Sequence, residues 1–207
     1  RIRAHIHSVL KQTPGHVAIF APSYALLEQI LIEDEDWMVR SRKMLQERSG
    51  ASKEEMDRMV DTLHRLRREG TPAILAGVLG GKLAEGVDYP GNILDAVVCI
   101  GLPLPPPSSR QDALRSYYEE RFGKQRAWRY AGSQPAVNRL LQAIGRPIRK
   151  AADRALVVIL EKRLLQRGYR FCLPKGAHMV ECVDSDRTER HAERFFRNNP
   201  DPAKHIE

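Results

Sequence analysis

The 207-residue sequence has only three cysteines, and their placement excludes two kinds of protein. Cys99, Cys172 and Cys182 are scattered along the chain, and no two of them have CxxC spacing. A disulfide scaffold needs paired cysteines, and a zinc site needs clustered ligands. We therefore expect reduced thiols and no metal site in this sequence.

The sequence also lacks long hydrophobic runs, internal repeats and a signal-peptide pattern. No apolar run approaches the roughly 20 residues that a membrane-spanning helix needs, so we expect no membrane partner. Positive charge is abundant instead: 34 Lys and Arg against 26 Asp and Glu give a net charge of +8. Such an excess favours polyanionic partners, because each phosphate contact releases condensed counterions.

Four short apolar runs are separated by stretches with helical patterning. Continuous runs of this kind are typical of strands that are buried on both faces of a parallel sheet. Alternation of such strands with helices predicts a doubly wound α/β domain. The four runs are residues 17–21 (VAIFA), 73–78 (AILAGV), 96–101 (AVVCIG) and 155–160 (ALVVIL).

The stretches between these runs predict the helices. Residues 33–70 are charged and read as helical, with a capping box formed by Ser52 and Glu55. Further helices are expected over 111–130 and 133–144. We assign residues 1–183 to the α/β domain and 184–207 to a charged tail that contains one helix.

A glycine-rich segment after the second apolar run resembles a phosphate-binding loop. Residues 77–83 (GVLGGKL) approach the GxxxxGK[ST] pattern. Leu83, however, stands where a hydroxyl should ligate magnesium, and Ala76 stands where the first glycine should be. We therefore expect that this chain does not hold a magnesium nucleotide by itself.

The same segment continues as GGKLAEGVDYP, in which three charged residues follow two glycines. We expect Lys82, Glu85 and Asp88 to cluster in one loop at the carboxyl end of a strand. Functional loops of open α/β sheets lie at that edge. From the residues alone, a plain glycine-rich turn is an equally good interpretation.

The segment QAIGRPIR brings together an amide and two guanidinium groups. Gln142, Arg146 and Arg149 have i, i+4 and i+7 spacing, so on a helix they share one face. Two fixed guanidiniums can clamp a γ-phosphate during transfer. The alternative is a solvated basic helix end. Gly145 favours the first interpretation, because a glycine there weakens a helix and indicates a close approach.

Together these segments resemble the XPD-like superfamily 2 DNA helicases. GGKLAEGVDYPG is similar to helicase motif V, QAIGRPIR to motif VI and VAIFAPSY to motif IV, and residues 101–105 (GLPLP) also fit. The resemblance extends over most of residues 15–175. It implies a RecA-like parallel sheet flanked by helices, which is the second motor domain of an ATP-dependent 5′ to 3′ helicase. The DinG-type helicases share this framework.

The resemblance implies that motif VI faces the nucleotide. Gln142, Arg146 and Arg149 would contact ATP from this lobe, with Arg149 as the arginine finger. Pro147 is a departure from the pattern, because it removes a backbone donor and predicts a kink ahead of Arg149.

The other two motifs are implied to couple nucleotide state to DNA. In motif V the resemblance assigns this coupling to Glu85, Gly86 and Asp88. The residues near the backbone of the single strand would be Ser23, Tyr24 and Lys82.

The resemblance also implies several partners outside this sequence. ATP and Mg would be held mainly by an N-terminal helicase lobe, and an iron–sulfur cluster would belong to that missing half. Single-stranded DNA is the expected substrate, and repair proteins are further candidates. We expect a cytoplasmic location for an archaeal source and a nuclear one for a eukaryotic source. The alternatives are a basic nucleic-acid-binding domain with no ATP role and a scaffold that recruits a repair partner.

Overall fold

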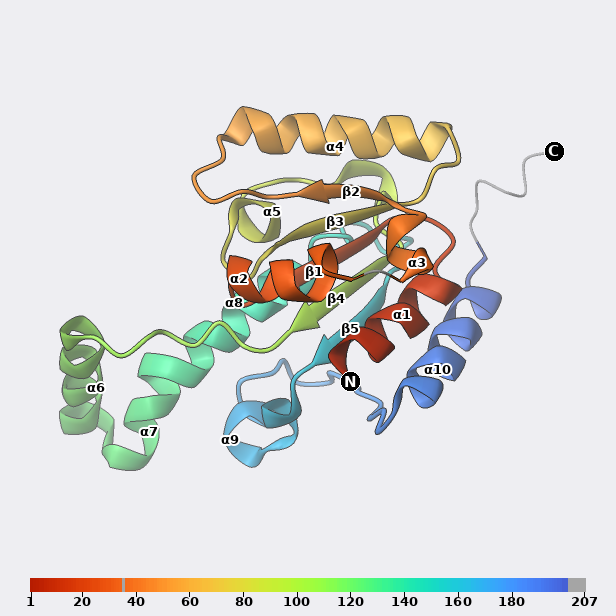
Figure 1. Cartoon of the computed structure of the whole chain (residues 1–207). Helices are drawn as coiled ribbons and strands as arrows, with labels where there is room; N and C mark the ends of the chain where they lie inside the picture. The colour runs from red at the N-terminus through yellow and green to blue at the C-terminus, as the bar shows by residue number, and fades with distance from the viewer. Residues whose placement is uncertain (35, 201–207) are drawn as a thin grey trace.

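The computed structural model describes residues 1–34 and 36–200. Five parallel strands form one sheet in the order β2-β3-β1-β4-β5, as Figure 1 shows. This arrangement confirms the predicted α/β fold with a parallel sheet. The strands are β1 (Val17–Ala21), β2 (Lys43–Gln46), β3 (Ala73–Val78), β4 (Ala96–Ile100) and β5 (Leu156–Leu160).

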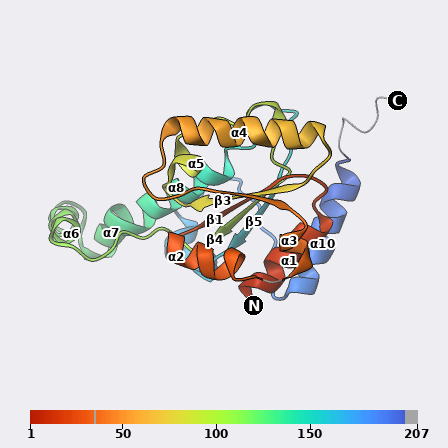
Figure 2. The ribbon, with the colours of Figure 1, turned by 45° about the horizontal axis from the view of Figure 1, so that its top comes forward.

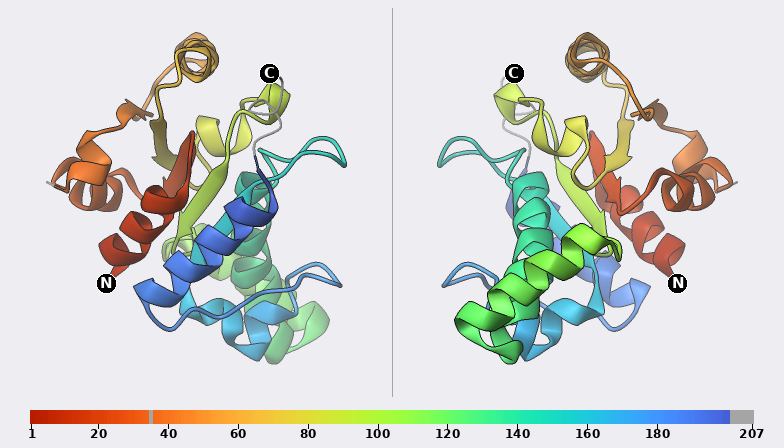
Figure 3. Two further views of the ribbon diagram at one scale, coloured as in Figure 1. Left: turned by 90° about the vertical axis from the view of Figure 1, so that its right-hand side faces the viewer. Right: turned by 90° about the vertical axis from the view of Figure 1, so that its left-hand side faces the viewer.

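Helices cover both faces of the sheet (Figure 3). One face is covered by α4 (Lys53–Arg68), α5 (Lys82–Glu85) and α8 (Gln134–Ile144). The other face is covered by α1 (Ile2–Gln12), α2 (Tyr24–Leu27) and α3 (Trp37–Arg40). Further α-helices are α6 (Ser109–Phe122), α7 (Lys124–Trp128), α9 (Arg167–Arg170) and α10 (Ser185–Asn198).

The central strand β1 shows why the apolar runs predicted buried strands. Ala18 and Phe20 pack into the core beneath α4, α5 and α8, whereas Val17, Ile19 and Ala21 pack into the core on the opposite face. Because successive side chains alternate between faces, a strand covered on both sides must be apolar throughout. Its register is also fixed on both sides by hydrogen-bonded neighbours.

Strand β2 corrects the expectation of a continuous helix over residues 33–70. The chain there forms α3, then β2, then a loop that leads to α4. As an edge strand with an exposed lysine and three half-buried residues, β2 carries no continuous apolar run. The later part of the prediction is confirmed: Ser52 and Glu55 form the capping box of α4, and Gly70 follows the helix with φ +66°.

The helix expected in the tail is α10, and it packs along α1. The Ser8 hydroxyl donates to the Ser185 carbonyl at 2.9 Å, and the His5 ring lies 2.8 Å from the Thr188 hydroxyl. The last residues of the tail, 201–207, lie outside the described part. Across the described ranges, no helix is long and apolar enough to cross a membrane.

Candidate functional site

The candidate residues lie at the two opposite edges of the sheet. Ser23 and Lys82 lie in the segments that follow β1 and β3, so they lie at the carboxyl edge of the parallel sheet. Asp88 belongs to the loop that leads into β4, and Arg149 to the loop that leads into β5. Both loops therefore lie at the amino edge. The expectation that Asp88 stays beside Lys82 is wrong, because α5 carries the chain from one edge toward the other.

Glu47 holds the loop at the carboxyl edge, and the expected helix over residues 33–70 does not predict this role. This buried side chain follows β2, and its carboxylate accepts the backbone N–H of Lys82 at 2.7 Å. It also accepts the N–H of Val78 at 3.4 Å. A Cβ on Gly81 would lie 2.6 Å from Glu47 Oε2, so glycine is required there. The loop that resembles a phosphate cradle thus already binds a carboxyl group of its own chain.

Two of the predicted DNA-contacting residues, Tyr24 and Lys82, interact with Glu47, and the third, Ser23, follows β1 at the same edge. Ser23 caps α2, because its hydroxyl oxygen accepts the Leu26 N–H at 3.3 Å. Burial raises the pKa of Tyr24, and the charge of Glu47 raises it further, so the phenol keeps its proton at neutral pH. Lys82 donates from Nζ to the Ala51 carbonyl at 2.6 Å. The Tyr24 hydroxyl and the Lys82 amino group therefore provide hydrogen-bond donors at this edge.

Arg146 is committed to backbone contacts at the amino edge. Its Nε donates to the Ala84 carbonyl at 2.9 Å and its Nη1 to the Val87 carbonyl at 3.1 Å. Nη2 donates to the Glu85 carbonyl. The side chain is only 18% exposed. Since these carbonyls lie at the end of α5 and just after it, the guanidinium closes that helix and joins motif VI to motif V.

The backbone after α8 corrects the predicted geometry of motif VI. The helix ends at Ile144, and Gly145 is its C-terminal cap. The atom nearest to a Cβ built on Gly145 is the Leu141 carbonyl oxygen of the same helix, at 3.1 Å. The predicted helical face shared by Gln142, Arg146 and Arg149 is therefore wrong beyond Ile144. Gly145 ends the helix, and Pro147 cannot extend it.

A turn held by an aspartate presents Arg149. Asp153 Oδ2 accepts the backbone N–H groups of Arg149 and Lys150, each at 2.7 Å, and these bonds lower the pKa of Asp153. The Arg149 guanidinium pairs with Asp88. Arg149 is 46% exposed and Asp88 is 80% exposed. Gln142 is exposed on the last turn of α8, toward the same edge.

Asn92, which the sequence did not single out, joins the two loops of the amino edge. Its Oδ1 accepts the Arg154 N–H at 2.7 Å, and its Nδ2 donates to the Arg154 carbonyl at 2.9 Å. The amide thus pairs with a backbone as a neighbouring strand would. Asn92 has φ +50°, a conformation that asparagine tolerates better than most residues.

Helix α5 connects the two edges. Lys82 begins it, and Gly86 caps it by donating its N–H to the Lys82 carbonyl at 2.7 Å. Between them, Glu85 Oε1 is buried, and no described residue donates a hydrogen bond to it. A Cβ on Gly80 would lie 3.7 Å from that oxygen. One helical turn therefore spans the distance between the Lys82 loop and the Arg146 contacts.

Comparison with known families identifies this arrangement. The model of the helicase C-terminal domain matches residues 6–179 of the chain. The chain belongs to this helicase family. Its relatives include helicases of the XPD, DinG, CHL1 and Fanconi anemia group J types.

Individual relatives cover the domain to different extents. The ATP-dependent DNA helicase DinG of Photobacterium profundum is 32% identical over 102 residues, which are 49% of this chain and 14% of the relative. The ATP-dependent DNA helicase CHL1 of Scheffersomyces stipitis is 27% identical over 176 residues, covering 77% of this chain and 21% of the relative. The chain thus corresponds to a small part of each relative.

Solved structures support the same fold. An XPD helicase structure superposes with a TM-score of 0.64 at 23% identity, covering 83% of this chain and 29% of that one. A second XPD structure, in its apo form, gives a TM-score of 0.64 at 22% identity over 87% of this chain and 35% of that one.

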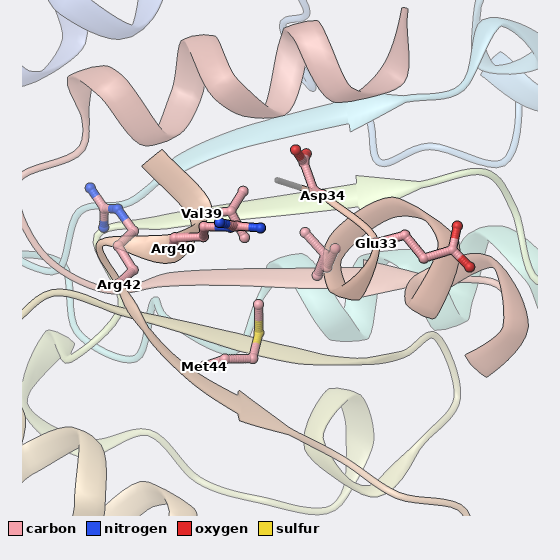
Figure 4. Close-up of a pocket in the computed structure, with 7 residues that line it drawn as sticks. Glu33, Asp34, Val39, Arg40, Arg42 and Met44 are labelled. Atoms are coloured by element: carbon pink, nitrogen blue, oxygen red, sulfur yellow. The ribbon is translucent and has the colours of Figure 1, made fainter. Parts of the chain in front are cut away.

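One cavity of the helicase domain lies apart from the motif residues. Figure 4 shows this cavity of about 400 Å³, lined by Glu33, Asp34, Arg40 and Arg42 among others. Arg42 there donates to the carbonyls of Gly15, Leu10 and Thr13, at 2.5, 2.8 and 2.6 Å, so it ties α1 and its following loop to β2. The Arg42 contacts beside this cavity thus have a packing role.

A second cavity of about 350 Å³ adjoins motif V. Three aspartates line it, Asp57 and Asp61 from α4 and Asp88 from the loop, together with Lys53. Clustered carboxylates repel phosphate groups. The lining therefore does not suit a nucleotide, and the exposed guanidinium of Arg149 remains the better candidate.

Proposed function

We propose that this chain is the second motor domain of an ATP-dependent 5′ to 3′ DNA helicase of the XPD type, and that Arg149 is its arginine finger. The observation that carries the proposal is the contrast between the two motif VI arginines. The Arg146 guanidinium donates to three backbone carbonyls, whereas that of Arg149 is half exposed and, among the described residues, pairs with one exposed aspartate. An exposed ion pair contributes about 0–1 kcal/mol, so Arg149 is readily released.

The chemistry assigned to Arg149 is electrostatic. ATP and Mg belong mainly to the N-terminal lobe, which this chain would face with its amino edge. As the γ-phosphoryl group is transferred, its oxygens carry charge that a guanidinium stabilises, an effect of about 10³ to 10⁵ in rate. Gln142 lies exposed toward the same edge and suits a hydrogen bond to the nucleotide. The iron–sulfur cluster is assigned to the other half, because the cysteines here are scattered.

Helix α5 supplies the coupling in this proposal. Its far end is held by Arg146, next to Asp88, and its near end begins at Lys82 beside the proposed DNA track. Motion of the amino edge on ATP turnover would therefore move Glu85 and Gly86 and reach Ser23, Tyr24 and Lys82. The unpaired Glu85 oxygen supports a role in such a movement, since buried polar atoms without partners are rare.

A DinG-type helicase is the second candidate. The 32% identity to the DinG protein of Photobacterium profundum favours it. Both candidates assign the same roles to Arg149 and to the carboxyl edge. They differ in cellular role, for which repair by an XPD-type helicase is our proposal.

The proposal is tested in the full two-lobed protein with Arg149→Ala. Loss of the finger should lower ATP turnover by about 10³-fold or more, and single-strand binding without nucleotide should stay within about twofold. Lys150→Ala, which removes the neighbouring cation of the same turn, is the matched control and should retain turnover. Turnover that survives in Arg149→Ala would refute the finger assignment.

A further inference from the structure

The hairpin formed by α6 and α7 is the part of the molecule that the proposed function does not use. It extends away from the sheet and its covering helices in Figures 1 and 2. Every residue of α6 is exposed or half-buried. Large apolar side chains are nevertheless concentrated there: Leu114, Tyr117, Phe122 and Tyr130 are 37% to 49% exposed. Exposed apolar groups that gather in one place indicate a contact surface.

One side of α6 holds the hairpin together. Tyr118 and Phe122 are one turn apart, and their rings lie 5.6 and 5.0 Å from the ring of Tyr130 in the segment after α7. Gln111, on the same side, donates from Nε2 to the Ala131 carbonyl at 2.7 Å. These contacts hold the two helices of the hairpin together, but they leave the outer side of α6 without a role.

The outer side presents a stripe of cations around an aromatic ring. Arg110, Leu114, Tyr117 and Arg121 have i, i+4, i+7 and i+11 spacing, which places them on one line along the helix. We call these four residues the α6 stripe. The Arg121 guanidinium lies 5.5 Å from the centre of the Tyr117 ring and donates to its hydroxyl at 2.5 Å. The acidic residues of α6 point to other sides of the helix: Asp112, Glu119 and Glu120.

The hairpin starts at the edge that carries the proposed DNA track. The chain leaves the carboxyl end of β4 at Gly101, and a Cβ there would lie 3.4 Å from Pro22, which precedes Ser23. An extended segment then leads to α6. A strand that lies along Ser23 and Lys82 and continues outward would therefore meet the hairpin next.

We propose that the α6 stripe is a second binding site for single-stranded DNA, beyond the motifs. Tyr117 stacks on a base, and Arg110 and Arg121 pair with the flanking phosphates. Aromatic rings interleaved with cations are the composition that binds single strands without sequence preference, whereas a duplex hides its base faces. The positive charge of the stripe, with the carboxylates turned away, complements a polyanion. This site rests on the proposed function, because it extends the same track.

Stacking is tested by measuring the affinity of the full chain for a fluorescent oligothymidine and for an abasic strand of equal length. Tyr117→Ala should weaken oligothymidine binding roughly tenfold, which is the usual scale of one base stack. It should leave the abasic strand within about twofold, because only the base contact is lost. Tyr117→Phe keeps the ring and should bind almost normally. Equal losses on both strands, or no loss on either, would overturn the stacking assignment.

The cations are tested with a charge-matched control. Arg110→Ala with Arg121→Ala should reduce the salt slope of binding by about 1.4, since each phosphate contact on a single strand contributes about 0.7. Arg187→Ala with Arg190→Ala removes the same charge from exposed positions of α10, on the opposite side of the molecule, and should change the slope far less. Equal salt slopes for the two double variants would overturn the site, because the net charge of the chain alone would then explain the salt dependence of binding.

A third variant separates this site from the proposed function. Ser23→Ala with Lys82→Ala removes two predicted contacts of the carboxyl edge. If that variant loses affinity while the stripe variants do not, the stripe is wrong and the track stands. If the stripe variants lose affinity and the edge variant does not, the stripe stands and the proposed track through the motifs is wrong. Competition by an acidic peptide at the stripe, without any oligothymidine binding there, would overturn the DNA assignment.

Discussion

The two edges of the sheet are built by different means. At the amino edge, polar side chains bridge loop to loop: Asn92 pairs with Arg154, Asp153 holds the turn of Arg149, and Arg146 binds the end of α5. At the carboxyl edge, glycines let the backbone close on one carboxylate, that of Glu47. Side-chain bridges can be released one at a time, whereas a closely packed backbone resists any added atom. Each edge should therefore respond to a different kind of perturbation.

The largest expected effect is a loss of stability at low pH, and it comes from His16 at the amino edge. This buried ring donates from Nε2 to the Leu63 carbonyl at 2.9 Å and accepts the Ala73 N–H at Nδ1, at 3.1 Å. Burial, with a smaller effect of the Arg67 charge, lowers the pKa of His16 from 6.5 to about 4. Protonation would also remove the acceptor of the Ala73 N–H.

The pH dependence follows from this lowered pKa. Between pH 6.5 and 4 the unfolded chain binds a proton at His16 that the folded chain excludes, so stability falls as the pH drops through that window. The loss should be on the order of 3 kcal/mol by pH 4. Urea unfolding of the chain and of His16→Asn, which keeps an acceptor near Nδ1, measures it as the difference between their pH slopes. Identical slopes would show that the edge is not pinned by a neutral imidazole.

The second effect tests the packed backbone of the carboxyl edge. A Cβ on Gly81 would lie 2.6 Å from Glu47 Oε2 and 2.9 Å from Val78 Cγ2, so Gly81→Ala should cost about 2 kcal/mol of unfolding free energy. Gly168→Ala is the matched control, because a Cβ there meets nothing within 4 Å and Gly168 lies inside α9. That control should be neutral or slightly stabilising. If both variants unfold at the same urea concentration, Glu47 does not constrain the loop.

Some of the strands and site residues at these two edges can be predicted from the sequence, and others cannot. Strands β1, β3, β4 and β5 were predictable, because a strand between two helical layers must be apolar throughout. Strand β2 was not, because an edge strand with an exposed lysine lacks that signal. Glu47 was missed with it, since its partners are backbone groups more than thirty residues away.

Motif VI shows a different limit. Its residue types indicate phosphate chemistry, but the i, i+4 and i+7 spacing puts its arginines on one face only if the helix continues past Ile144. Gly145 and Pro147 were the available signals that α8 ends at Ile144. Arg146 binds backbone carbonyls of the motif V segment, and Arg149 pairs with a carboxylate of the same segment. These partners lie far away in the sequence, so the spacing within motif VI does not predict them.

The third prediction compares the unfolding free energies of variants at Arg146 and Arg149. Arg146→Ala removes charged hydrogen bonds to three carbonyls at the end of α5 and should cost roughly 1–2 kcal/mol of unfolding free energy. Arg149→Ala should cost less than about 1 kcal/mol, because it breaks one exposed pair. Thermal or urea unfolding of the two variants measures both values. A reversed order would mean that Arg149 is the structural residue and Arg146 the available one.

The smallest expected effect is the coupling energy between Asp88 and Arg149, and the assignment of Arg149 as arginine finger depends on it most directly. Arg149 can serve the nucleotide only if its pairing with Asp88 is weak in the free domain. A double-mutant cycle of Asp88→Ala and Arg149→Ala should give a coupling energy below about 1 kcal/mol, and molar salt should remove most of it. The cycle also cancels the separate 3.9 Å approach of Asp88 to Arg146, which both Asp88 variants lose equally. A salt-resistant coupling above about 2 kcal/mol would mean a locked pair, because releasing Arg149 would then cost a large share of what a finger contributes.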